Sequence, residues 1–274
     1  MKKIGKQLIA AVLITALAAT FTGCGRKEAL ANADVEKIIV GTGNAYEPYC
    51  YLDDSGNLAG YEYEVLKVVD ELLPQYEFEF QTSDFANVLI SLDAGKIDIA
   101  AHQYEYNEER DEKYLFGEEA YTTYVTYLVV AGDRTDITSL DDLQGLKVKS
   151  SSGSNASYIL ENYNQEHADN PIQIDYVNNS TDEETVTGIL NGVWDATIAT
   201  KRDVEKLNKG YGDGADVLKT VGEAVQSSST YFLFDKENTT LKEAVDGAVK
   251  ELRENGRLAE ISTQVIGGDY TESE

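Results

Sequence analysis

The pattern of apolar and polar residues predicts a first stretch in which strands and helices alternate. Three short strands are expected in it, at 38–41, 77–81 and 96–101. Two helices are expected between them, because apolar residues recur there at helical spacing. One follows Gly60 and stops at Pro74, and the other is capped by Ser83 and ends at Gly95. This alternation predicts an α/β lobe with a largely parallel sheet.

A second stretch of the same kind follows residues 121–130, which are rich in β-branched and aromatic residues and long enough to pass between lobes. Its strands are expected at 146–149, 172–177 and 196–199. Capping boxes at Ser139 and Thr181 mark two helix starts, and residues 150–155 precede a further helix. A second α/β lobe is therefore predicted.

The last part of the chain is expected to return as a strand at 231–234, followed by a helix that Thr239 or Thr240 caps and a shorter helix after Gly256. The acidic residues after them are interpreted as a tail. The predicted organisation is a signal peptide (1–23), a tether (24–37), lobe 1 (38–127 plus 229–266), lobe 2 (128–228) and a tail (267–274).

The two stretches contain a similar short sequence motif. Leu-x-x-Gly-x-x-Asp, ending at Asp98, leads into one strand, and Leu-x-Gly-x-x-Asp, ending at Asp195, leads into another. Ligands collect beyond the carboxyl ends of strands in open α/β sheets, so residues 102–110 and 200–202 are expected to face each other across a cleft. The aspartates precede their strands, so structural turn or cap roles are favoured over ligand contacts.

Arg110 is the first candidate for ligand binding. Asn107 is well placed to cap a helix beginning at residue 108, which puts Arg110 in a first helical turn, where the helix dipole disfavours a cation. An anion that joined the arginine would be favoured by both the guanidinium and the helix end, and a carboxylate suits both. The residues leave a second interpretation open, in which Arg110 is a surface arginine paired with Glu108 or Asp111.

Composition narrows the classes of function. Lys and Arg total 23 against 49 Asp and Glu, and the net charge of -26 disfavours nucleic acid and anionic lipid surfaces as partners. The chain has no HExxH, CxxC, P-loop, GxSxG or GxGxxG motif and only two histidines. No catalytic residue, cofactor or metal is therefore expected.

The N-terminus predicts export. Residues 1–23 have a basic start, an apolar run and small residues before Cys24, as in a secretory signal. The segment 21–24 resembles a bacterial lipobox, whose cysteine is lipidated; ordinary secretion with a free Cys24 is the alternative. With Cys24 acylated, Cys50 has no disulfide partner, and we expect a small buried thiol, with a redox role beside a thiol-containing ligand as the alternative.

Five segments together match one protein family, namely residues 40–49, 60–66, 83–89, 95–98 and 107–110. Through them the chain from about 38 to 266 resembles the bacterial family 3 extracellular solute-binding proteins, the amino-acid receptors of ABC importers. The resemblance implies a two-lobed α/β fold of the periplasmic-binding-protein type II, with two strands crossing between lobes that close on a ligand.

The resemblance also implies site residues. In the family, the arginine aligned with Arg110 grips the ligand α-carboxylate, and aromatic residues aligned with Tyr46 and Phe85 pack on the ligand. The amides of a loop in lobe 2 reach the same carboxylate. The other positions that the resemblance assigns to the site are His102, Gln103, Glu105, Ser154 and Asn155.

Thr200 departs from the family pattern, which commonly has an aspartate there to hold the ligand α-ammonium. A hydroxyl cannot balance that charge, so another carboxylate is needed or the ligand is unusual. Glu105 is the candidate, because it follows the central strand beside Arg110. The alternative is that Glu105 is a solvated glutamate.

The sequence thus favours a monomeric, lipid-anchored receptor that delivers a polar amino acid to an ABC permease. Residues 153–156 and 160–164, with Tyr-x-x-x-x-Glu-Arg ending at Arg110, look most like the cystine-binding branch. Two alternatives differ in class. One is an enzyme like the cyclohexadienyl dehydratases, with His102 or Glu105 as acid or base, and the other is a sensory ligand-binding module.

Overall fold

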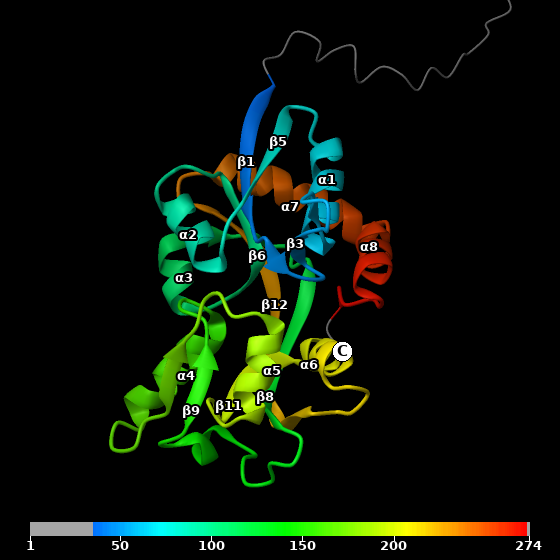
Figure 1. Ribbon diagram of the computed structural model, residues 1–274. Helices are drawn as coiled ribbons and strands as arrows, with labels where there is room; N and C mark the ends of the chain where they lie inside the picture. The colour runs from blue at the N-terminus through cyan, green and yellow to red at the C-terminus, as the bar shows by residue number, and fades with distance from the viewer. Residues whose placement is uncertain (1–34, 273–274) are drawn as a thin grey trace, which may run out of the picture. The chain divides into compact units, whose positions relative to one another are not determined.

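The computed structural model describes residues 35–272, which form two lobes and two strands that run between them (Figure 1). Lobe 1 contains β1 (Glu36–Thr42), β2 (Ala45–Tyr46), β3 (Cys50–Leu52), β4 (Leu58–Ala59), α1 (Tyr61–Leu72), β5 (Tyr76–Thr82), α2 (Phe85–Asp93), β6 (Ile99–Glu105), α3 (Glu108–Lys113), β7 (Tyr114–Phe116), α7 (Thr239–Glu254) and α8 (Arg257–Ile266). The predicted signal peptide, Cys24 and most of the predicted tether lie outside the described residues.

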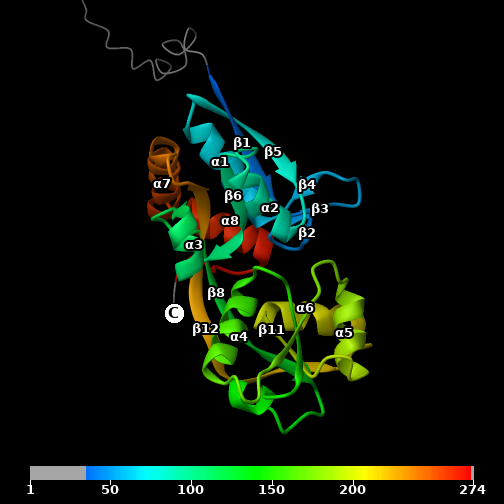
Figure 2. The same cartoon turned by 90° about the vertical axis from the view of Figure 1, so that its left-hand side faces the viewer.

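Lobe 2 contains a 3-10 turn, η1 (Leu140–Leu143), with β9 (Lys147–Ser150), α4 (Asn155–Glu166), β10 (Gln173–Tyr176), α5 (Asp182–Leu190), β11 (Ala196–Thr200) and α6 (Lys201–Tyr211). Two antiparallel strands join the lobes, β8 (Thr122–Ala131) and β12 (Leu218–Asp235). Figure 2 shows both strands passing between the two groups of elements. The exact residues at which one lobe gives way to the other, 127/128 and 228/229, stay a prediction.

The two lobes have the same arrangement of parallel and antiparallel strand pairs. In lobe 1, β1 pairs in parallel with β5 and β6, and β6 pairs antiparallel with β12. In lobe 2, β9 pairs in parallel with β10 and β11, and β11 pairs antiparallel with β8. The full order is β10-β9-β11-β8-β12-β6-β1-β5, with β7 on β12 and a separate sheet of β2, β3 and β4. The predicted alternation is confirmed in both halves.

Asp98 and Asp195, the aspartates that end the repeated motif, have the same structural role. The Asp98 carboxylate accepts a hydrogen bond from the backbone N–H of Ile39 at 2.7 Å, and its own N–H donates to the carbonyl of Ile39 at 2.7 Å. Asp195 does the same with Lys147, at 2.9 and 2.7 Å. Each aspartate ties the start of one strand to its neighbour, which confirms the structural interpretation.

Each lobe has hydrophobic cores on both faces of its sheet. In lobe 1, α1, α7 and α8 pack on the face that contains Val40, and α2 packs on the face that contains Ala100. In lobe 2, α4 packs on the face with Leu128, and α5 and α6 pack on the face with Val129. Successive strand residues point to opposite faces, so two helical layers enclose each sheet and leave the strand ends to build a site.

Several predicted boundaries are wrong, and the shift at β6 matters most. A strand was expected at 96–101, but it runs from Ile99 to Glu105, and all seven residues are buried. The polar residues at its end belong to the strand because they are buried against a cavity and not exposed to solvent. The N-cap of α2 is Asp84 and not Ser83, and that of α7 is Asn238.

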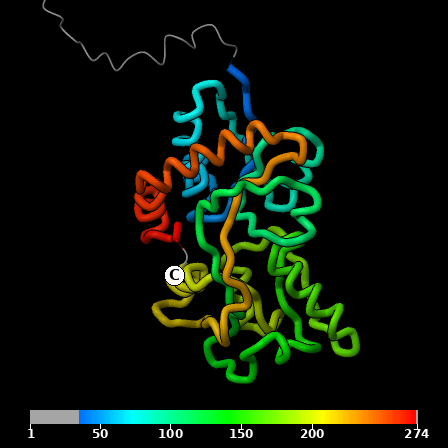
Figure 3. The backbone as a smooth tube through the Cα atoms, turned by 180° about the vertical axis from the view of Figure 1, so that it is seen from behind, coloured from blue at the N-terminus to red at the C-terminus, as the bar shows by residue number. Residues whose placement is uncertain are grey.

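The C-terminal segment, which the sequence predicts to be a tail, is hydrogen-bonded to β8 through Tyr270. The carbonyl of Tyr270 accepts hydrogen bonds from the N–H of Thr123 at 2.7 Å and from the hydroxyl of Thr122 at 3.0 Å. Thr271 is buried. Figure 3 shows this red segment beside the yellow helix α6. Its backbone forms hydrogen bonds with β8, and these bonds hold the segment against the protein despite its acidic composition.

Candidate ligand-binding site

A cavity of about 850 Å³ is lined by residues of both lobes. Eight of the nine predicted ligand-binding residues line it, namely Tyr46, Phe85, His102, Gln103, Glu105, Arg110, Ser154 and Asn155. Thr200 does not. Residues of the predicted segment 102–110 therefore line one space, as expected for strand ends in an α/β fold. The predicted facing segment is wrong, because none of residues 200–202 lines this cavity, whereas residues 154–156 after β9 do.

Arg110 is a buried cation on α3 and only 5% exposed. Its guanidinium donates to the carbonyl of Glu105 and to that of Gly153, each at 2.7 Å. Neither Glu108 nor Asp111 forms an ion pair with it, so the surface-pair interpretation is wrong. Burial lowers the pKa of Arg110, because a desolvated charge is unfavourable until an anion joins it.

The orientation of Arg110 is fixed by its own helix. Asn107 caps α3 as predicted, since its side-chain oxygen accepts from the Arg110 N–H at 2.8 Å. The amide of Asn107 then donates to the side-chain oxygen of Asn155 at 3.0 Å, across the lobes. The Asn155 amide in turn donates to Gln226 on β12. This polar chain holds the arginine and the start of α4 together.

The start of α4 offers unpaired donors to the cavity. Ser154 caps the helix, accepting from the Ser157 N–H at 3.0 Å, and its own N–H donates to Ser151. The N–H groups of Asn155 and Ala156 have no acceptor among residues 35–272, and both residues line the cavity. These two amides, more than that of Ser154, can receive an anion beside Arg110.

Aromatic side chains form one wall. The ring of Phe85 meets the edge of His102 at a centroid distance of 4.9 Å and an angle of 90°, and Tyr46 stacks on His102 at 5.9 Å. The hydroxyls of Tyr46 and Tyr124 are 2.5 Å apart. Burial lowers the pKa of His102, and its Nδ1 has no hydrogen-bond partner in the described chain. Within residues 35–272, no side chain therefore orients the His102 ring through Nδ1, as the partner of a general base does.

Gln103 has a positive φ of 50°, an unusual conformation for a residue with a side chain. A buried carboxylate holds it there, because Glu62 on α1 accepts from the Gln103 N–H at 2.5 Å and from its side-chain amide at 3.1 Å. The hydroxyl of Tyr121 also donates to Glu62, at 2.6 Å. Sequence reasoning missed Glu62, although it lies in the quoted segment 60–66.

Glu105 is a buried acid at the end of β6, only 7% exposed, so the solvated alternative is wrong. Its carboxylate accepts from the Ser228 hydroxyl at 2.5 Å, and the charge of Arg110 attracts it. Burial nevertheless raises the pKa of Glu105. A partly desolvated carboxylate that the charge of Arg110 attracts therefore lies at the end of β6, and its role toward a ligand ammonium stays a prediction.

Thr200 is 3% exposed and caps α6, a helix that the sequence analysis did not predict. Its N–H and hydroxyl donate to the carboxylate of Asp203 at 3.0 and 2.7 Å, in a capping box. Asp203 itself lines the cavity. The Thr-x-x-Asp spacing was the signal that could have identified both the helix and this acid.

Comparison with known proteins gives consistent matches. The family model of bacterial extracellular solute-binding proteins, family 3, matches residues 38–268. The L-cystine-binding protein TcyJ of Bacillus subtilis is 36% identical, covering 96% of this chain and 96% of its own. A solved structure from Listeria monocytogenes, provisionally named an L-cystine ABC transporter, is 38% identical with a TM-score of 0.79, covering 87% of this chain and 99% of that one.

A third structure, from work on glutathione import via GshT and the cystine ABC importer TcyBC of Streptococcus mutans, is 26% identical with a TM-score of 0.77. It covers 88% of this chain and 98% of that one. The predicted fold class, a two-lobed α/β fold of the periplasmic-binding-protein type II, is confirmed. No helix within residues 35–272 has the length and apolar character to span a membrane.

Proposed function

Because the chain belongs to the bacterial extracellular solute-binding proteins, family 3, we propose that it is an extracytoplasmic receptor that captures a polar amino acid between its lobes and delivers it to an ABC importer. The observation that carries this proposal is the buried Arg110, whose charge has no ion-pair partner among residues 35–272 and which lines a cavity shared by both lobes. Similarity to L-cystine-binding proteins favours cystine as the ligand.

The ligand α-carboxylate would lie between the lobes. The Arg110 guanidinium reaches it from lobe 1, and the free N–H groups of Asn155 and Ala156 reach it from lobe 2. Charge-assisted hydrogen bonds of this kind are about twice as strong as neutral ones. A ligand that binds both lobes stabilises the closed form over the open one, since it makes all of its contacts only there.

The ligand α-ammonium would be balanced by Asp203. Its carboxylate lies 2.7 Å from the Thr200 hydroxyl, so it occupies the space into which a longer acidic side chain at position 200 would extend. One of its oxygens has no hydrogen-bond partner in the described part of the chain. Glu105 stays the second candidate, because the charge of Arg110 already attracts its carboxylate.

We further propose that Cys24 is lipidated and anchors the receptor to the cell membrane on its extracytoplasmic face. The basis is the lipobox-like segment 21–24 at the end of a signal-like sequence. Fatty-acid labelling of cells should mark the native chain and not the Cys24→Ser variant. Equal labelling of both would contradict the anchor.

A thermal-shift screen of the twenty amino acids and cystine tests the receptor function. A ligand at 100 times its Kd adds about 2.7 kcal/mol to the stability of the folded state. In a chain of this size we expect the melting temperature to rise by roughly 5–10 °C with the best ligand. The absence of a shift with every compound would contradict the proposal.

A further inference from the structure

Lys149 is a cation that the proposed carboxylate and ammonium contacts leave unused. It lies on β9 and lines the cavity, and no carboxylate in residues 35–272 is within ion-pair distance of its Nζ. Among residues 35–272, Asp182 is the acid whose charge influences it. That acid is already paired with Lys206 at 3.1 Å. A positive charge therefore faces the cavity without a partner.

The ammonium group of Lys149 is partly desolvated by its surroundings. The side chain is half-buried, and burial lowers its pKa. Its Nζ lies 6.0 Å from the centre of the Trp194 ring, a weak attraction at that distance. An anion would relieve the cost of holding an uncompensated ammonium there.

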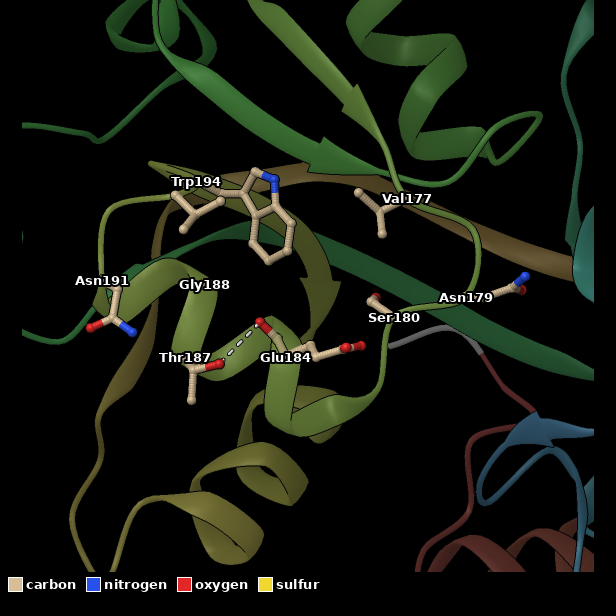
Figure 4. Close-up of a pocket in the computed structure, with 9 residues that line it drawn as sticks. Val177, Asn179, Ser180, Glu184, Thr187, Gly188, Asn191 and Trp194 are labelled. Carbon is tan, nitrogen blue, oxygen red and sulfur yellow. Dashed lines mark hydrogen bonds between the residues drawn. The ribbon is translucent and has the colours of Figure 1, made fainter.

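A second hollow of about 440 Å³ adjoins the cavity on this side. It is lined by Trp194 and shares Val177, Asn179 and Ser180 with the larger cavity. Figure 4 shows the Trp194 ring facing Val177, with Ser180 on the segment that leads into α5. The polar side chains on this segment can surround a hydrated ligand end.

Lys149 and Arg110 line the same cavity, but different acidic residues act on their charges. Arg110 is attracted by Glu105, whereas the acid near Lys149 is Asp182. Arg110 comes from α3 in lobe 1 and Lys149 from β9 in lobe 2. The cavity of about 850 Å³ has the size of sites for ligands well above a single small amino acid.

We propose that Lys149 binds a second carboxylate, at the end of the ligand remote from Arg110. The site then selects elongated amino acids with two carboxylate ends, such as two amino acids joined through their side chains. This inference rests on the proposed receptor function and assigns a specificity residue to the same site.

Calorimetry with a matched pair of ligands tests the assignment. L-cystine has two carboxylates, and the mixed disulfide of cysteine and cysteamine lacks only the second one. Wild-type protein should bind cystine about tenfold tighter or more, as expected for a charge-assisted contact. Lys149→Met, which keeps the apolar stem, should lose this preference through weaker cystine binding, with little change for the mixed disulfide. Lys149→Arg should retain most of it.

Lys147→Met is the matched control, because Lys147 lies two residues away on the same strand and is exposed. It should leave both affinities unchanged. Equal losses of both ligands in Lys149→Met would show a structural role and overturn the inference. If wild-type protein binds amino acids but does not prefer the diacid, the inference fails while the receptor function stands. If it binds no amino acid, both fail.

Discussion

Two carboxylates that line the cavity, the half-buried Asp203 and the buried Glu105, are the candidates for balancing a ligand ammonium. Burial raises the pKa of each, so the folded protein holds these protons more tightly than the unfolded chain. Their contribution to stability is therefore full below the unfolded pKa of about 4 and is lost as pH rises through the raised folded pKa. A ligand ammonium has the opposite preference, because it favours the ionised form.

Ligand affinity should consequently fall as pH drops through the raised pKa of the free protein. Titration calorimetry from neutral pH down to mildly acidic pH measures this, and binding should release protons in that range. The Asp203→Asn variant should bind more weakly at neutral pH and lose the pH dependence. If Glu105→Gln alone has these effects, Glu105 is the ammonium partner. An affinity that stays constant over the range in wild-type protein would contradict both assignments.

Among the secondary-structure elements, two helices begin at the cavity, and their capping residues can be recognised in the sequence. The Thr181 hydroxyl accepts from the N–H of Glu184 at 3.1 Å, and the Glu184 carboxylate accepts from the Thr181 N–H at 2.8 Å. The same box recurs at Thr200 and Asp203. Both boxes start helices whose first turns border the cavity, so cap residues fix where polar side chains enter it.

Thr181→Ala should destabilise the ligand-free protein by about 1 kcal/mol, because it leaves a backbone donor of α5 unsatisfied. Thr187→Ala on the same helix is the control. Its hydroxyl donates to the carbonyls of Glu183 and Glu184 within the same helix, and alanine is a good helix former, so a change within about 0.5 kcal/mol is expected. Urea unfolding monitored by circular dichroism measures both. Equal midpoints for the two variants would show that the cap contributes nothing.

Much of the fold could be predicted because local signals agree with tertiary structure. The capping boxes at Ser139 and Thr181 and the cap at Asn107 are all present. The end of β6 could not be placed, since polar residues buried by a cavity look like solvent-exposed loop residues. Helix α6 was missed because its surface is largely polar, with Val204 and Leu207 as its main buried apolar residues.

The site was predicted less completely than the fold. Arg110 was a candidate because a cation in a first helical turn calls for an anion, and the family resemblance favoured this role over a surface ion pair. Asp203 was missed although its Thr-x-x-Asp spacing with Thr200 is a local signal. Glu62 could not be identified, since its importance depends on a contact with Gln103 that only the folded chain makes. Such long-range contacts leave no periodic pattern in the sequence.

Contacts outside the cavity also join the lobes at the scale of the whole molecule. Arg202 on α6 donates to the hydroxyl of Tyr49 in lobe 1, and its guanidinium lies 3.9 Å from the centre of the Tyr270 ring. Tyr270 belongs to the C-terminal segment that is bound to β8. These contacts favour the arrangement in which both lobes line one cavity.

Arg202→Ala should weaken ligand binding by roughly 1 kcal/mol, although Arg202 does not line the cavity, because it removes contacts present only between the lobes. Lys201→Ala is the control, since its cation lies over Tyr127, which pairs with β11 of lobe 2. Calorimetry gives the affinities, and small-angle X-ray scattering should show a larger ligand-free radius for Arg202→Ala. Unchanged affinity and radius would exclude this role.

The most direct test of the proposed carboxylate site is calorimetric titration of Arg110→Ala with the amino acid that gives the largest thermal shift in wild-type protein. Lys113→Ala, on the same helix but exposed, is the control. Arg110→Lys keeps the charge without the fork and should fall between them. We expect Arg110→Ala to lose about 2–5 kcal/mol of binding free energy while still melting cooperatively. Binding as tight as that of wild-type protein would contradict the carboxylate site at Arg110.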